Sequence, residues 1–260
     1  MAILELQKIS KSFGGIGAIA SLDLHVEKGE ILGLIGPNGA GKTTTFNIIS
    51  GVYPPSSGTV FFDGKNITGM KAHKVAKIGI ARTFQITSLF RDYTVLENVL
   101  TGFHLSLHSG LWSSVFPTSK RLKSEREIRD RALEILGFLE INHLQGQKAR
   151  TLSFGHQRLL SMAMALALDP KLLMLDEPIG GLNPEEISMI VDRIQKIRSR
   201  KPDIAILLVE HNMSVVMSIC DRIVVISFGM KTAEGSPEEV RSNPEVIKAY
   251  LGSGYASQCR

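Results

Sequence analysis

The chain has 260 residues, 43% hydrophobic and 21% charged, a composition that provides for a substantial buried core. Its two cysteines, Cys220 and Cys259, form neither a disulfide framework nor a metal-binding spacing, which favours a reducing compartment. The stretch "MAILELQKIS", 1–10, lacks the long apolar region of a secretory signal, so we expect none there. The longest apolar run, 162–168, is far shorter than the roughly 20 residues of a membrane-spanning helix. We therefore expect a soluble globular protein. The net charge of +5 permits an anionic partner, but a modest excess of charge on a solvated surface explains it as well.

The first 70 residues predict two partly buried strands. In 22–27, "LDLHVE", apolar and polar residues alternate, as in a strand with one buried face. A second strand is predicted in "GTVFFDG", 58–64, where Asp63 and Gly64 indicate a closing turn.

Short apolar runs without alternation predict strands that are buried on both faces. They are 31–36, 171–176, 203–210 and 221–227, and a further strand is expected to end at Gln85 in "IARTFQ". Helical patterns separate these runs, so the sequence predicts an α/β fold with a parallel sheet.

The middle of the chain predicts a helical lobe inserted into that core. No buried strand is expected between Thr94 and about Leu144. Apolar residues recur there at helical spacing, with charged residues on the other face. These apolar residues are Ile128, Ala132, Ile135, Leu136 and Leu139.

A phosphate-binding loop is predicted between a buried strand and a helix. "GPNGAGKTT" contains Gly36, four residues, Gly41, Lys42 and Thr43, the G-x-x-x-x-G-K-[ST] pattern. In this pattern backbone N–H groups surround the β-phosphate, the lysine lies between the β- and γ-phosphates, and the hydroxyl binds Mg²⁺. The sequence therefore predicts a nucleotide site.

Other buried strands end in residues suited to hydrolysis. Asp176 and Glu177 follow one strand, Glu210 and His211 follow another, and Gln85 ends a third. Because parallel strands of an open sheet end at one edge, these groups are expected to converge there. Asp176 would hold Mg²⁺ through water, and Glu177 would act on the attacking water. Taken singly, each has an ordinary structural explanation, such as capping a turn.

A second anion site is predicted at Ser153. This residue is a good N-cap for the apolar segment that follows, and the helix would present free N–H groups and a positive dipole end. No local nucleophile, metal cluster or glycine-rich loop accompanies it in "TLSFGHQ", 151–157.

Taken together, these segments resemble the ATP-binding subunits of ABC transporters along essentially the whole chain. The loop 36–43 resembles Walker A, "LSFGHQ" the ABC signature, "LLMLDEP" Walker B and "GGLNP" the D-loop. Gln85 resembles the Q-loop glutamine and His211 the switch histidine, while Phe13 matches the aromatic that stacks on adenine.

The resemblance implies a site that binds ATP and Mg²⁺. It implies catalytic roles for Glu177, His211, Gln85 and Lys42, and metal ligation by Thr43, Gln85 and Asp176. Two ATPase chains are expected to pair head to tail, so that Ser153 and Gly155 act on the ATP of the partner. The complete set of expected ATP-binding residues is Phe13, Gly36, Pro37, Asn38, Gly39, Ala40, Gly41, Lys42, Thr43, Thr44, Ser153 and Gly155.

Three residues depart from the commonest family pattern. Phe154 replaces a glycine of the signature, as it does in amino acid importers, and His156 replaces its glutamine. Asn183 stands where the D-loop more often has aspartate. His156 either contacts the nucleotide of the partner or faces solvent, and both alternatives stay open.

The implied fold is a P-loop NTPase (RecA-like) α/β core with a parallel sheet, an N-terminal antiparallel β subdomain and an inserted α-helical subdomain. The expected single cassette, 1–260, divides into a nucleotide-binding core (1–90 and 160–235), a helical subdomain (91–159, with an insertion at 104–124) and a C-terminal tail (236–260).

Three segments point to one subfamily. "ARTFQITSLFRDYTVLENV", "GGLNPEE" and "NPEVIKAYLG" resemble the ATPases of branched-chain amino acid importers, and the insertion 104–124 agrees. Such a chain is expected on the inner face of the cell membrane, with permease subunits, a second ATPase chain or a second copy of itself, and indirectly an external substrate-binding protein. Nucleic acid is not expected. The alternatives are a lipid or lipopolysaccharide exporter ATPase, a soluble translation or DNA-acting ABC protein, and a regulatory cassette without activity.

Overall fold

The structure, a computed structural model, describes residues 2–83, 89–103, 119–244 and 246. The chain forms two compact units, which are described separately. Unit 1 comprises Met1–Arg82, Lys171–Glu177 and Ile194–Arg260, and unit 2 comprises Thr83–Pro170 and Pro178–Arg193. The subdomain limits drawn from the sequence stay a prediction. Within the described residues, no helix is long and apolar enough to cross a membrane.

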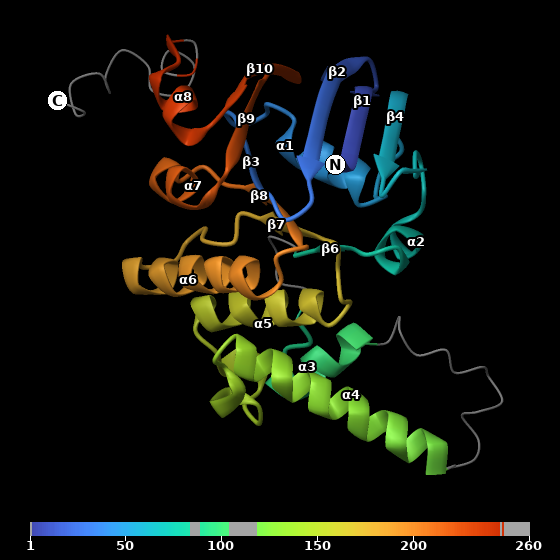
Figure 1. Cartoon of the computed structure of the whole chain (residues 1–260), viewed down its shortest axis with the longest axis vertical. Coiled ribbons are helices and arrows are strands. Elements are labelled where there is room, and N and C mark those ends of the chain that lie inside the picture. Colours follow the sequence, from blue (N-terminus) through green and yellow to red (C-terminus); the bar gives the residue numbers. More distant parts are fainter. Residues whose placement is uncertain (1, 84–88, 104–118, 245, 247–260) are drawn as a thin grey trace. The chain divides into compact units, whose positions relative to one another are not determined.

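Unit 1 contains a six-stranded sheet in the order β10-β9-β3-β8-β7-β6 (Figure 1). All neighbours are parallel except β10, which pairs antiparallel with β9. The strands are β3 (Ile31–Ile35), β6 (Ile80–Arg82), β7 (Leu172–Asp176), β8 (Ala205–Val209), β9 (Arg222–Ser227) and β10 (Met230–Gly235). Every residue of β3, β7 and β8 is buried, so the prediction of doubly buried strands is confirmed.

One strand end differs from the prediction. β6 ends at Arg82, whereas Gln85 was expected to end this strand, so that expectation was wrong. β6 is an edge strand that pairs only with β7, through Ile80 to Arg82. The chain then passes into unit 2 at Thr83, which ends the pairing. Gln85 lies outside the described residues.

A second, antiparallel sheet in unit 1 has the order β2-β1-β4-β5. Its strands are β1 (Ala2–Phe13), β2 (Ile16–Glu27), β4 (Ser57–Phe62) and β5 (Lys65–Asn66). Leu22, Leu24 and Val26 are buried while Asp23 and His25 are exposed, which confirms the predicted alternation. Apolar residues of this sheet, of the parallel sheet and of helix α1 (Lys42–Ile49) share one hydrophobic core.

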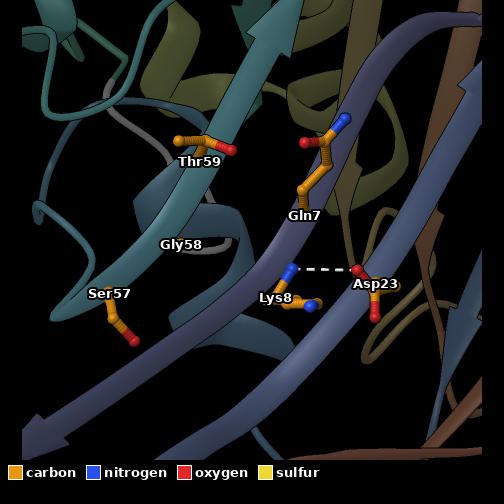
Figure 2. Close-up of a pocket in the computed structure, with 6 residues that line it drawn as sticks. All are labelled: Gln7, Lys8, Asp23, Ser57, Gly58 and Thr59. Atoms are coloured by element: carbon orange, nitrogen blue, oxygen red, sulfur yellow. Dashed lines mark hydrogen bonds between the residues drawn. The ribbon is translucent and has the colours of Figure 1, made fainter.

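A bulge in β1 adjoins an open hollow on the antiparallel sheet. The pairing of β1 with β2 shifts register between Leu6 and Ile9, and Lys8 adopts a φ of 47°. The Lys8 N–H donates to Asp23 Oδ1 at 2.8 Å, as Figure 2 shows. At Gly58 a Cβ would lie 2.4 Å from the Lys8 carbonyl oxygen, so only glycine fits beside the bulge. The hollow contains none of the residues predicted to bind ATP; it is lined by Gln7, Lys8, Asp23, Ser57, Gly58 and Thr59.

The remaining helices of unit 1 are short. They are α2 (Ala72–Lys77), α7 (Met213–Ile219) and α8 (Pro237–Ser242). Helix α6 (Pro184–Arg200) begins in unit 2 and ends in unit 1.

Unit 2 is helical in the described part, as predicted for the middle of the chain. Helix α3 (Val95–Gly102) packs on α4 (Ser119–Phe138) and α5 (Phe154–Leu166). Two short 3-10 helices, η3 (Asn142–Leu144) and η4 (Ala149–Thr151), lie between α4 and α5. Ala132, Leu136 and Leu139 are fully buried, which agrees with the predicted apolar stripe.

Candidate nucleotide site and signature helix

The loop 36–41 connects β3 to α1, as the phosphate-loop pattern predicts. Gly36 adopts a φ of 157°, and a Cβ there would lie 2.1 Å from the Ile226 carbonyl oxygen, so the close approach to β9 excludes any side chain. The Gly229 N–H donates to the Ala40 carbonyl at 3.0 Å, which ties the loop to the β9–β10 turn. Helix α1 has Gly41 as its N-cap and no side-chain cap. No side chain caps the first N–H groups of this helix, which suits the binding of an anion at the loop.

Lys42 is held at this loop. Its side chain is buried, and Nζ donates to the carbonyl oxygens of Gly36 at 2.6 Å and Pro37 at 3.0 Å. Burial lowers the pKa of Lys42, while the negative charges of Glu177 and Asp176 act to raise it. The ammonium group therefore lies in the field of both carboxylates.

Of the other loop residues, Asn38, Gly39 and Thr43 are exposed, and Pro37 and Thr44 are half-buried.

Strand β7 delivers Asp176 and Glu177 to the same edge. Asp176 is buried, and its Oδ2 accepts a hydrogen bond from Arg82 Nη2 at 2.7 Å. Glu177 adopts a φ of 47°, a left-handed conformation that is unfavourable for a residue other than glycine. Its N–H donates to the Val209 carbonyl at 2.9 Å, which fixes the backbone where the side chain leaves β7.

Strand β8, the neighbour of β7, ends beside these residues. Glu210 is fully buried, and its Oε2 accepts from the His211 N–H at 3.2 Å. The exposed His211 places Nδ1 3.9 Å from Glu177 Oε1. The structure thus brings Lys42, Asp176, Glu177 and His211 together at the carboxyl ends of β3, β7 and β8.

Phe13 ends β1 with its side chain 44% exposed. Its ring makes an edge-to-face contact with Tyr53, with ring centroids 5.5 Å apart. Lys11 Nζ lies 5.1 Å from the centroid of the Phe13 ring. An exposed aromatic with an aromatic and a cationic neighbour suits stacking against a flat base. The sequence did not indicate Tyr53.

Ser153 caps helix α5 as predicted. Its Oγ accepts from the His156 N–H at 3.4 Å and lies 3.1 Å from His156 Nδ1. The structure therefore gives His156 a partner within its own chain. Burial, followed by the nearby charge of His143, lowers the pKa of His156, whereas Glu186 acts to raise it.

A carboxylate of the same chain lies at the N-terminus of α5. Glu186 Oε1 accepts from the Gly155 N–H at 2.9 Å, and this bond is the main reason that the pKa of Glu186 lies below its ordinary value. Asn183 Oδ1 accepts a hydrogen bond from the Glu186 N–H at 2.9 Å. Glu186 therefore also takes part in capping the N-terminus of α6. The positive end of α5 thus already attracts an anion in the single chain.

Besides Tyr53, two residues of these sites, Glu186 and Arg82, were missed from the sequence. The Asn183-x-x-Glu186 spacing did signal a helix cap, but not a bond to Gly155. Arg82 gave no signal beyond a charged residue after an apolar segment. Its contact with Asp176 joins residues 94 positions apart and depends on the order of the strands.

The comparisons agree with this geometry. The model of the ABC transporter family matches residues 19–180, and that of the branched-chain amino acid ATP-binding cassette transporter matches 233–256. The chain is 43% identical over 250 residues to the high-affinity branched-chain amino acid transport ATP-binding protein BraF of Pseudomonas aeruginosa, covering 96% of this chain and 98% of that protein. LivG of Escherichia coli, which carries the same description, is 42% identical over 253 residues, with coverage of 96% and 98%.

Solved structures give the same result. The ADP conformation of MJ1267, an ATP-binding cassette of an ABC transporter, superposes with a TM-score of 0.84 at 32% identity, covering 97% of this chain and 99% of that one. A dimeric post-hydrolysis state of the cassette MJ0796, bound to ADP and Pi, gives a TM-score of 0.75 at 26% identity, with coverage of 90% and 98%. The chain therefore belongs to the ABC transporter ATP-binding family, and it is a nucleotide-binding ATPase with the P-loop NTPase fold.

Proposed function

We propose that this ATPase drives uptake of branched-chain amino acids or similar small polar solutes by an ABC importer. The observation that carries the proposal is the match at residues 233–256, outside the ATPase motifs, to the branched-chain family. Relatives that match 96% of the chain are named as branched-chain amino acid transport proteins. This agreement also weighs against an exporter or a translation factor.

The proposed reaction is hydrolysis of the bond between the β- and γ-phosphates of ATP. Phe13 stacks on the adenine, and the loop 36–44 surrounds the phosphates, with Lys42 supplying a positive charge. Water attacks the γ-phosphorus and transfers a proton to the Glu177 carboxylate, while the bond to the β-phosphate oxygen breaks and leaves ADP. His211, 3.9 Å from Glu177, orients this carboxylate and the attacking water. Gln85 completes the proposed catalytic set.

The chain offers oxygen ligands that suit Mg²⁺. Thr43 contributes a hydroxyl at the start of α1, and Asp176 a buried carboxylate at the end of β7. Among the described residues, no group of three or more His, Cys, Asp or Glu is arranged to hold a metal. The Thr43 hydroxyl and the Asp176 carboxylate are oxygen ligands of the kind that Mg²⁺ prefers, and Mg²⁺ takes its other ligands from phosphates and water. We propose Thr43, Asp176 through water and Gln85 as its ligands; bound there, Mg²⁺ neutralises charge that develops on the phosphates.

We further propose that Ser153 and Gly155 act on ATP held by a second ATP-binding chain. Ser153 and Gly155 lie at the N-terminus of a 13-residue helix, and Phe154 beside them is 71% exposed. The dimeric state of the related cassette MJ0796 supports this arrangement. Closure of the dimer around ATP would change the surface that the helical unit presents to permease subunits on the inner face of the membrane. An external binding protein would deliver the solute to the permease from the opposite face.

The proposal is tested by identifying the partners of the chain. We would tag it in its native host, solubilise the membranes gently and analyse the proteins that co-purify. Two polytopic permeases with an ATP-binding chain are expected, and uptake of labelled leucine should cease when the gene is deleted. Co-purification with lipid-export membrane proteins, or with ribosomes and no permease, would contradict the importer.

A further inference from the structure

Arg82, at the end of β6, lies buried among three parts of unit 1. Its side chain is 7% exposed. Nη2 donates to Asp176 Oδ2 at 2.7 Å, and Nη1 donates to Asn47 Oδ1 at 2.7 Å and Ser50 Oγ at 3.1 Å. The guanidinium carbon lies 5.4 Å from the centroid of the Phe46 ring. One planar group thus joins β6, β7 and the helix that follows the phosphate loop.

The partners of Arg82 adjoin two of the three proposed metal ligands, Thr43 and Asp176. Asp176 is one of them, and Asn47 follows the other, Thr43, by four residues on α1. Residues four apart lie on the same face of a helix, so Arg82 contacts α1 one turn beyond Thr43. The hydrogen bonds of the guanidinium therefore constrain the distance between α1 and the end of β7.

The shape of the arginine fork suits this task. A guanidinium makes several hydrogen bonds in a fixed plane, whereas a lysine ammonium is a point charge on a flexible stem. A carboxylate bound through Oδ2 presents Oδ1 in a fixed direction. Partners of this kind orient metal ligands and tune their affinity without touching the metal.

We infer that Arg82 is a positioning residue, which holds Asp176 and α1 at the spacing that Mg²⁺ with ATP requires. This inference rests on the proposed ATP site. It differs from a purely structural role, in which Arg82 would stabilise the sheet and leave the metal dependence unchanged.

The chain offers a matched control on the same sheet. Arg222, at the start of β9, is also largely buried; its Nε donates to Glu30 Oε1 at 2.8 Å, and it forms a further ion pair with Glu234. None of these partners belongs to the proposed ATP site. A lysine at position 222 therefore repeats the loss of a guanidinium fork without touching the metal ligands.

The test measures nucleotide binding by the purified full chain, first in EDTA and then across a titration of Mg²⁺. A fluorescent ATP analogue reports binding, so that no hydrolysis is needed. In Arg82→Lys and Arg82→Gln, the Mg²⁺ concentration that gives half of the maximal increase in nucleotide binding should rise about tenfold or more, as for other residues that orient metal ligands. The nucleotide affinity of these variants in EDTA should stay at the wild-type value. In Arg222→Lys, both the affinity in EDTA and the Mg²⁺ midpoint should stay at the wild-type values.

Asn47→Ala gives a second measurement. It removes the hydrogen bond of Arg82 to Asn47 on α1 and keeps the ion pair of Arg82 with Asp176. It should shift the Mg²⁺ midpoint in the same direction by a smaller factor. The inference is overturned if Arg82→Lys and Asn47→Ala leave the midpoint unchanged, or if binding weakens equally with and without Mg²⁺. A wild-type chain that binds no nucleotide would instead contradict the proposed function itself.

Discussion

The helix after the phosphate loop and the signature helix both offer an N-terminus to an anion, but a side chain of opposite charge lies at each: Lys42 at the first and Glu186 at the second. At α1, Gly41 adds no side-chain cap, and the buried Lys42 adds a positive charge. At α5, Ser153 caps the helix, and Glu186 brings a carboxylate to the Gly155 N–H. The first end is thus prepared to attract phosphate by itself, whereas at the second a phosphate must compete with a charge of the same chain.

This difference indicates how one chain separates binding from turnover. In the proposed mechanism, ATP binds at the α1 end, with Phe13 of β1 and the strand ends of β7 and β8. For the α5 end to bind a phosphate, that phosphate would have to displace the Glu186 carboxylate from the Gly155 N–H.

The largest effect is expected at the α1 end from Glu177→Gln. The amide keeps the shape but accepts no proton, so kcat for ATP hydrolysis should fall about 10²- to 10⁴-fold, while nucleotide affinity is kept. Hydrolysis is measured as phosphate release, and binding with a fluorescent analogue. Glu185→Gln, an exposed position at the start of α6, is the control and should hydrolyse ATP normally. Robust hydrolysis by the Glu177 variant would remove this residue from its proposed role.

Lys42→Ala removes the positive charge that distinguishes the α1 end. Loss of charge-assisted bonds to phosphate should weaken ATP binding about 10- to 100-fold. Calorimetry at constant ionic strength measures the change in ATP affinity. Lys77→Ala, at an exposed position on α2, is the control for loss of a positive charge. Equal affinity in both variants would mean that the α1 end does not bind ATP as proposed.

Glu186→Gln changes the charge at the α5 end and leaves the α1 end as it is. In a Glu177→Gln background, the ATP-dependent dimer should form at roughly two- to tenfold lower protein concentration, because repulsion between the carboxylate and phosphate is removed. Sedimentation velocity measures this change, which should shrink at high salt. The matched control is again Glu185→Gln. A weaker dimer in the Glu186 variant would show that the contact with Gly155 organises the helix for its partner instead of competing with it.

The smallest effect concerns His156. Because burial and the charge of His143 lower its pKa, His156 should titrate below its ordinary value of about 6.5, and His143→Asn should raise that pKa. NMR of the ring protons follows the titration. Below that ordinary value the unfolded chain binds more protons at this site, so its contribution to the unfolding free energy falls as the pH decreases. An unchanged pKa in the variant would contradict a charge effect of His143.

The sequence predicted the strands and caps because their signals are local. The buried runs form β3, β7, β8 and β9. Ser153 caps α5 by accepting a hydrogen bond from the N–H of His156, three residues further along the chain. Arg82 and Glu186 were missed because their roles depend on partners 94 and 31 residues away. The end of β6 was placed too late because pairing with β7 stops at Arg82, which no residue pattern within "IARTFQ" reveals.

The central claim is that the α5 end serves ATP held by another chain, and complementation tests it most directly. Lys42→Ala disables the α1 end and Ser153→Ala the α5 end, so each variant alone should hydrolyse ATP poorly. We take a second copy of this chain as a sufficient partner in solution. A head-to-tail dimer of the two variants contains one site with both ends intact, so mixing them should restore part of the wild-type rate. A mixture no more active than its separate components, at concentrations where the wild type is active, would contradict the account.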